Sequence, residues 1–288
     1  MSRLSIAIPA SIISDIPHLR EKTSRVGLIG RAVAIFRVNE VIVYPDNPLT
    51  NQTEDANLIA TLLTYMETPQ YLRKALFKLS PSLQYAGILP PLRTAHHPLN
   101  RRSSDLKAGE YREGVIVSTT RKGSLIDIGV EWPALAADVQ SPIGTRVTTR
   151  ILRIGKPVEV ELANRGQIPE YWGYLVTVQK HPLGESIRQR GYDLAIATSK
   201  YGEPFGLAMK QISEEWVKAS DVLVAFGSPS AGLNEIIARE GLCLNDLVDF
   251  TVNTLPMQGT ETVRTEEALI ATLACLNATL SRETGSNL

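Results

Sequence analysis

The sequence predicts an α/β protein whose mostly parallel sheet is interrupted by a small all-β insert. Short apolar runs alternate with helical patterns near both ends of the chain, as at residues 4–8 and 222–226. Residues 111–154 instead hold short β-branched runs separated by Gly, Asp, Lys and Pro. Strands that alternate with helices form parallel sheets covered on both faces. We therefore expect the two ends to form one domain and the middle to be inserted into it.

The expected elements follow from apolar periodicity. At the two ends, we expect strands at residues 4–8, 41–44, 173–178, 193–197, 222–226 and 248–252. Helices are expected at residues 27–37, 55–66, 70–79, 213–218, 231–239 and 266–280. The strands of the insert, in the pattern of a sandwich or small barrel, are expected at residues 113–118, 124–128, 146–152 and 157–162. The predicted domains are 1–90 and 169–288, which form the split domain, and 91–168, which form the insert.

The composition is that of a globular protein, with 43% hydrophobic and 21% charged residues. No stretch approaches the roughly 20 apolar residues of a membrane span, and the N-terminal apolar segment is too short for a signal peptide. We therefore expect a cytoplasmic protein, nuclear or nucleolar in a eukaryote, with no membrane partner. Cys243 and Cys275 form no CxxC pattern and are expected as buried small hydrophobes. His96 and His97 have no third ligand at suitable spacing, so no metal is expected.

The charges are unevenly distributed, although the formal net charge is zero. Residues 68–104 and 139–158 contain no Asp or Glu. Local basic patches bind phosphates by releasing counterions, so zero net charge does not exclude a nucleic-acid partner. The alternative is that the basic side chains are scattered over solvated faces. The side chains expected to contact nucleic acid are Arg93, Arg101, Arg102, Arg146, Arg150, Arg153 and Lys156.

Two Gly-rich stretches near the C-terminus carry most of the functional information. They are residues 226–235 (FGSPSAGLNE) and 253–268 (NTLPMQGTETVRTEEA), and each follows an apolar run and leads to a helical pattern. Glycine lets backbone amides approach a ligand where a Cβ would block them. Neither stretch matches GxGxxG or GxxxxGK[ST], so neither is a standard nucleotide loop. This order, an apolar run followed by a Gly-rich stretch and a helical pattern, favours a binding site for a small ligand. The alternative is that both stretches are ordinary strand-to-helix loops.

These stretches, together with residues 27–44 (GLIGRAVAIFRVNEVIVY), resemble the SPOUT-class RNA methyltransferases. The resemblance is to the archaeal and eukaryotic branch, which has an OB-like β-barrel inserted into the methyltransferase domain. It implies an S-adenosylmethionine-dependent enzyme, a homodimer and a C-terminal trefoil knot through which the cofactor loops pass. It favours methylation of a uridine at N3 in ribosomal RNA, with ribose 2′-O-methylation as an open alternative. From a different class, a non-catalytic RNA-binding ribosome-assembly factor with a vestigial cofactor pocket is the alternative function.

The resemblance also implies which residues form the cofactor site. Backbone groups of the two stretches would enclose the adenine and ribose. The expected cofactor-binding residues are Phe226, Gly227, Ser228, Gly232, Leu255, Gly259, Val263, Thr265 and Ala268. Pro229 and Ser230 stand where many members have a Glu-Gly pair, which leaves the contacts of the first loop open. Thr265, followed by two glutamates, is expected to cap the last helix.

Three charged residues are catalytic candidates. Arg31 is the only charged side chain between residues 26 and 36, in an otherwise apolar helix, and a buried cation is costly without a partner. By the resemblance, we expect Arg31 to stabilise negative charge on a uracil ring or a phosphate. We expect Glu261 to accept the proton of the acceptor, and Arg264 to bind a phosphate or orient Glu261. The alternatives are that Arg31 pairs with a structural carboxylate or faces solvent, and that Glu261 stabilises its loop.

Overall fold

The computed structural model describes residues 2–284 and separates into two compact units. The first unit comprises Met1–Thr64, Ser82–Pro90 and Tyr174–Leu288, and the second comprises Tyr65–Pro81 and Pro91–Gly173. The first unit is thus discontinuous in sequence. Besides the whole predicted insert, residues 91–168, the second unit includes residues 65–81 before it and 169–173 after it.

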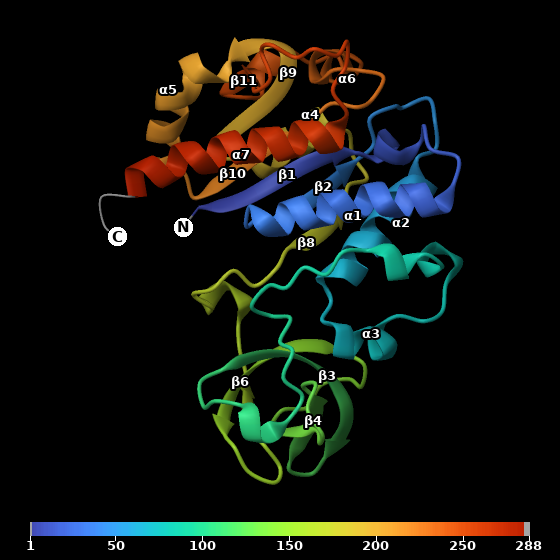
Figure 1. Cartoon of the computed structure of the whole chain (residues 1–288), viewed down its shortest axis with the longest axis vertical. Helices are drawn as coiled ribbons and strands as arrows, with labels where there is room; N and C mark the ends of the chain where they lie inside the picture. The colour runs from blue at the N-terminus through green and yellow to red at the C-terminus, as the bar shows by residue number, and fades with distance from the viewer. Residues whose placement is uncertain (1, 285–288) are drawn as a thin grey trace. The chain divides into compact units, whose positions relative to one another are not determined.

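A six-stranded sheet is the framework of the first unit (Figure 1). Its strand order is β11-β9-β10-β1-β2-β8, and every neighbouring pair is parallel. The strands are β1 (Arg3–Pro9), β2 (Glu40–Tyr44), β8 (Leu175–Val178), β9 (Leu194–Pro204), β10 (Asp221–Ala225) and β11 (Phe250–Asn253). The central strands β1 and β10 are almost wholly buried and apolar, as expected of a parallel sheet with both faces covered. The predicted α/β class with a parallel sheet is confirmed.

Helices cover both faces of this sheet. They are α1 (Leu19–Ile35), α2 (Thr53–Glu67), α4 (Leu183–Arg190), α5 (Phe205–Lys218), α6 (Leu233–Ala238) and α7 (Thr265–Thr284). Helices α1 and α7 lie side by side in Figure 1. Sequence periodicity placed the starts of α1 and α5 too late, at residues 27 and 213, and missed α4. The first turn of α1 and most of α4 are polar, so their short apolar stripes gave a weak signal.

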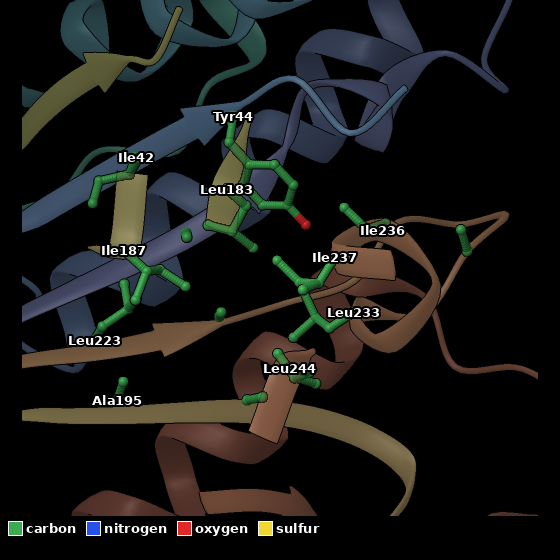
Figure 2. Close-up of a cluster of buried hydrophobic side chains, with 14 residues drawn as sticks. Ile42, Tyr44, Leu183, Ile187, Ala195, Leu223, Leu233, Ile236, Ile237 and Leu244 are labelled. Atoms are coloured by element: carbon green, nitrogen blue, oxygen red, sulfur yellow. The ribbon is translucent and has the colours of Figure 1, made fainter. Parts of the chain in front are cut away.

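Helices α4 and α6 share one hydrophobic cluster with the sheet (Figure 2). Leu183 and Ile187 of α4, with Ile236 and Ile237 of α6, pack over strand residues that include Leu223. Burying one such side chain contributes roughly 1.5–3 kcal/mol. The Tyr44 ring lies in the same cluster and is fully buried. The loop between β10 and α6 is therefore held at both of its ends by packed elements.

The second unit contains a closed five-stranded barrel in the order β3-β4-β5-β7-β6. Its elements are α3 (Gln70–Leu76), β3 (Tyr111–Thr120), β4 (Gly123–Asp127), β5 (Ala134–Ala137), β6 (Arg146–Arg153) and β7 (Glu159–Leu162). Ile116, Ile126 and Ile151 are among the side chains that fill its core. Closure leaves no strand edge unpaired. The predicted small barrel is confirmed, whereas β5 was missed because its alanine-rich sequence has little strand propensity.

Three further expectations concern the whole chain. No helix within residues 2–284 is long and apolar enough to cross a membrane. In the same residues, no group of three or more His, Cys, Asp or Glu side chains is placed to hold a metal ion. Cys243 is exposed and Cys275 is half-buried, so the expectation that both are buried was wrong. Cys243 lies in the turn after α6, with its side chain at the surface.

Candidate active site

A cavity of about 270 Å³ lies beside the loop that follows β10. Three segments form its walls: the loop after β10, the stretch after β11 that leads into α7, and the end of β9. The predicted cofactor-binding residues that line it are Phe226, Gly227, Ser228, Gly232, Leu255, Val263, Thr265 and Ala268. Gly259 belongs to the second loop but does not line the cavity. Residues that were selected from two separate stretches of sequence therefore surround one space.

Sequence reasoning missed the third wall. Thr198, Ser199, Lys200 and Tyr201 of β9 line the cavity, although the predicted strand ended at residue 197. β11 pairs with the extended part of β9 after a register shift between Thr251 and Val252. The Asn253 side-chain amide donates to the Lys200 carbonyl at 2.8 Å and ties this wall to the second loop. Thr198 and Tyr201 have high β-propensity and could have predicted a longer strand, but the Gly202 that follows suggested that the strand had ended.

The first loop is closed on itself by a tight turn. The Ser228 amide donates to the Ala231 carbonyl at 2.9 Å, and the Ala231 amide donates to Ser228 Oγ at 3.0 Å. A Cβ at Gly227 would lie only 3.1 Å from the Ala231 carbonyl oxygen, so a larger residue would crowd this turn. The Ser228 hydroxyl, expected to contact a cofactor, thus also stabilises its own loop.

Side-chain hydroxyls hold the backbone at the start of this loop. Tyr44 donates to the Phe226 carbonyl at 2.6 Å, and Thr265 donates to the Gly227 carbonyl at 3.1 Å. Burial raises the pKa of Tyr44, so its phenol stays protonated and remains a donor. Thr265 is the first residue of α7, so the expectation that it caps this helix was wrong. The cap position is taken by Arg264, whose amide donates to Glu267 Oε2 at 3.0 Å.

The catalytic candidates lie outside the lining of the cavity. Arg31 is half-buried on α1, whereas Glu261 and Arg264 are exposed in the loop before α7. None of the three is among the residues that surround the cavity. Their catalytic roles stay predictions.

A buried ion pair near the start of α7 was not expected. Arg25 of α1 is 9% exposed and pairs with Asp15 at 2.7 Å and with Glu266 at 3.2 Å. Its guanidinium also donates to the Ile12 carbonyl at 2.8 Å. Glu266 directly follows Thr265 in the chain, so this pair fixes α1 against the helix start that borders the cavity. The sequence offered no signal for it, because the paired residues are distant in sequence.

The lining is suited to S-adenosylmethionine. Phe226, Leu255 and Val263 offer apolar surface for a flat adenine ring, while hydroxyl, amide and backbone groups offer partners for ribose and amino-acid groups. Within the described part of the chain, Lys200 is the one charged residue in this lining. The described lining therefore contains no Asp or Glu that a ligand would bury. The donor set fits a cofactor held mainly by backbone groups.

Comparison with known proteins identifies the family. The profile of the family described as "Putative RNA methyltransferase" matches residues 3–276. The chain belongs to this RNA methyltransferase family. The 28S rRNA (uridine-N(3))-methyltransferase of Mus musculus is 32% identical over 97% of this chain and 77% of its own length. The Homo sapiens protein of the same name is 32% identical over 95% of this chain and 77% of its own length. An uncharacterised protein of Halobacterium salinarum is 32% identical over 96% of this chain and 99% of its own length.

Most basic residues predicted to bind RNA are exposed on the second unit of this methyltransferase. Arg93, Arg101, Arg102 and Lys156 are exposed. Arg150 and Arg153 are also exposed, and each pairs with a glutamate of the neighbouring strand β7. Exposed ion pairs contribute little to stability, so these two guanidinium groups remain available to phosphates. Six of the seven predicted side chains are therefore accessible.

Arg146 is engaged differently. Its guanidinium pairs with Glu67 at 2.6 Å and also with Glu113, both of which are buried. Burial alone raises the pKa of Glu113, but Arg146 and Arg165, with hydrogen bonds from Thr148 and Trp172, lower it below its usual value. Arg146 is thus part of a buried charge cluster inside the second unit, and we leave it out of the RNA-binding surface.

His96 and His97 belong to this cluster and both contact the same carbonyl. Their Nε2 atoms lie 2.9 and 2.8 Å from the carbonyl oxygen of Glu67, the last residue of α2. A carbonyl only accepts, so Nε2 carries the hydrogen in both rings. Thr94 Oγ1 lies 3.1 Å from Nδ1 of His96 and acts as the donor to that atom. These contacts give both histidines a structural role.

Acid should destabilise the second unit through these two rings. Burial lowers the pKa of each imidazole from 6.5 to about 4. The unfolded chain then binds more protons between these two pH values, so the free energy of unfolding falls as the pH drops from 6.5 towards 4. The loss should be on the order of 3 kcal/mol per histidine at pH 4. Denaturant titrations across this range should show a shallower pH dependence for His96→Gln and His97→Gln. His181→Gln, at an exposed position, is the control, and equal slopes for all variants would contradict this assignment.

Proposed function

We propose that this protein transfers a methyl group from S-adenosylmethionine to N3 of a uridine in ribosomal RNA. The observation that carries the proposal is the convergence of the two Gly-rich stretches on one cavity. The mouse and human relatives named as 28S rRNA (uridine-N(3))-methyltransferases support the choice of acceptor, since both match almost the whole chain. We further propose that the protein is a homodimer of the SPOUT class, with a C-terminal trefoil knot and an OB-like barrel.

The residues of the chain must position the acceptor and manage its proton. When bound, S-adenosylmethionine supplies an electrophilic methyl group, whose bond to sulfur breaks as a bond to N3 forms. The acceptor nitrogen has to lie in line with the sulfur–methyl bond, and positioning supplies much of the rate. N3 of uridine carries a hydrogen, which Glu261 would accept, while Arg31 would stabilise the negative charge that develops on the ring. Arg264 would hold a phosphate or orient Glu261.

RNA binding is proposed for the exposed basic side chains of the second unit. They are Arg93, Arg101, Arg102, Arg150, Arg153 and Lys156. Exposed aromatic side chains are few in this unit, and Trp132 is the most prominent, with 69% of its surface exposed. Phosphate contacts therefore outweigh base stacking in this proposal, so that this surface contributes affinity more than sequence specificity.

Calorimetry and nucleoside mass spectrometry test the proposed activity. The protein should bind S-adenosylmethionine and convert uridine to 3-methyluridine in a ribosomal RNA transcript. The absence of cofactor binding would overturn the enzymatic proposal and favour a non-catalytic assembly factor. A 2′-O-methylated nucleoside would instead overturn the choice of acceptor atom.

Neutralising the basic surface should weaken RNA binding without affecting the cofactor. The triple substitution Arg101→Ala, Arg102→Ala and Lys156→Ala should reduce the slope of log K against log salt by about 0.7 for each phosphate that the protein no longer neutralises. Filter binding at several salt concentrations measures this slope. Lys210→Ala is the control, since Lys210 is 87% exposed in the first unit. Equal slopes for the triple variant and the wild type would exclude these three side chains from the interface.

Removing the Arg31 guanidinium should separate catalysis from cofactor binding. Arg31→Ala should reduce methyl transfer by roughly 10²–10³-fold, the effect of losing one electrostatic donor in a transition state. The affinity for S-adenosylmethionine should stay within about twofold of the wild type. Arg20→Ala, at an exposed position of the same helix, is the matched control. A loss of both properties together would reassign Arg31 to folding.

A further inference from the structure

Three consecutive carbonyl groups at the end of β10 each accept a hydrogen bond from a side-chain hydroxyl. Thr198 Oγ1 donates to the Ala225 carbonyl at 3.0 Å, Tyr44 to that of Phe226 at 2.6 Å, and Thr265 Oγ1 to that of Gly227 at 3.1 Å. The three donors come from β9, β2 and α7, so they are far apart in sequence. We call residues 225–227 the clamped segment.

The hydroxyls of Tyr44 and Thr265 satisfy carbonyl groups that lie beyond the last residue of β10. β10 ends at Ala225, and its pairing with β1 ends at Ala7 and Ala225. Phe226 is 1% exposed, so solvent has little access to its backbone. A buried carbonyl without a donor is costly, which explains why a fully buried tyrosine is directed at this position.

Holding a carbonyl also fixes the direction of the next amide. The peptide unit is planar and trans, so the N–H of the following residue is directed opposite to the C=O. The bond from Tyr44 to the Phe226 carbonyl therefore sets the direction of the Gly227 amide. Tyr44 belongs to the core cluster of α4 and α6, so the Gly227 amide is turned away from that core. Gly227 lines the cavity.

Thr265 connects two walls of the cavity. It belongs to the second Gly-rich stretch, lines the cavity and donates to the Gly227 carbonyl of the first loop. Thr198 similarly connects the β9 wall to the clamped segment. A displacement of either wall would therefore be transmitted to the backbone of the first loop.

We propose that Tyr44, Thr198 and Thr265 are positioning residues that preorganise the clamped segment for S-adenosylmethionine, with Tyr44 aiming the Gly227 amide at the ligand. This inference rests on the proposed function, because it assigns roles within the same cofactor site. Preorganised backbone donors bind without the cost of ordering them, so loss of one hydroxyl weakens binding even when the fold is intact.

Tyr44→Phe removes one hydroxyl and keeps the ring. The dissociation constant for S-adenosylmethionine, measured by calorimetry, should rise about tenfold. Tyr174→Phe is the matched control, because Tyr174 is 2% exposed and donates to the Leu63 carbonyl at 3.0 Å within the same unit, outside the cavity lining. Both variants should lose similar thermal stability, since each loses one buried hydrogen bond. Only Tyr44→Phe should lose affinity, which a purely structural role would not predict.

Thr265 provides a second test with its own rescue. Thr265→Val should weaken cofactor binding several-fold, whereas Thr265→Ser, which keeps the hydroxyl, should restore it. Thr279→Val is the control on the same helix, since its hydroxyl donates to the Cys275 carbonyl within α7. Tyr44→Phe and Thr265→Val act on adjacent carbonyls, so their effects on affinity should be non-additive in a double-mutant cycle.

The outcomes separate this inference from the proposed function. If the wild type does not bind S-adenosylmethionine, the proposed function fails. If the wild type binds S-adenosylmethionine and both Tyr44→Phe and Thr265→Val bind it as tightly as the wild type does, only the positioning role fails. If Tyr44→Phe does not fold, the comparison of Thr265→Val with Thr265→Ser decides. Equal affinities of those two variants would overturn the inference.

Discussion

Parallel strand pairing brings the carboxyl ends of β9, β10 and β11 to one edge of the sheet, and the cavity depends on this arrangement. Ligands of open α/β sheets bind at the carboxyl ends of the strands, where the connecting loops converge. Here β10 is almost entirely buried and apolar, so it provides a rigid support for the loop that follows it. The hydroxyls of Tyr44, Thr198 and Thr265 continue this support beyond the last strand residue.

Buried ion pairs hold elements together in each of the two units. In the second unit, Glu67, Glu113, Arg146 and Arg165 form a buried cluster that joins the end of α2 to barrel strands and to the segment after β7. Removing one partner of such a cluster costs about 3–5 kcal/mol, because the others remain buried and unpaired. In the first unit, Arg25 and Glu266 hold α1 against α7. Both cases show that a charged residue in a basic or apolar stretch of sequence can be a structural element.

The functional site was partly predictable for a physical reason. Glycines that follow buried strands let the backbone approach a ligand, so both loops that line the cavity were recognised from local patterns and the resemblance they carry. The β9 wall was missed because a strand that bends past Gly202 loses its simple alternation. Arg146 was assigned to RNA from its acid-free surroundings in sequence, yet its carboxylate partners lie at positions 67 and 113.

The sequence alone determined the class of the fold, the barrel and the two Gly-rich loops that line the cavity, because periodicity, strand propensity and glycine placement are local properties. Only the tertiary structure decided which side chains hold the loop after β10, since their positions, 44, 198 and 265, are separated by most of the chain. It also decided that His96 and His97 share one carbonyl and that Arg146 pairs with buried carboxylates. Such contacts arise from how strands and helices pack, and no pattern within a short window of sequence encodes them.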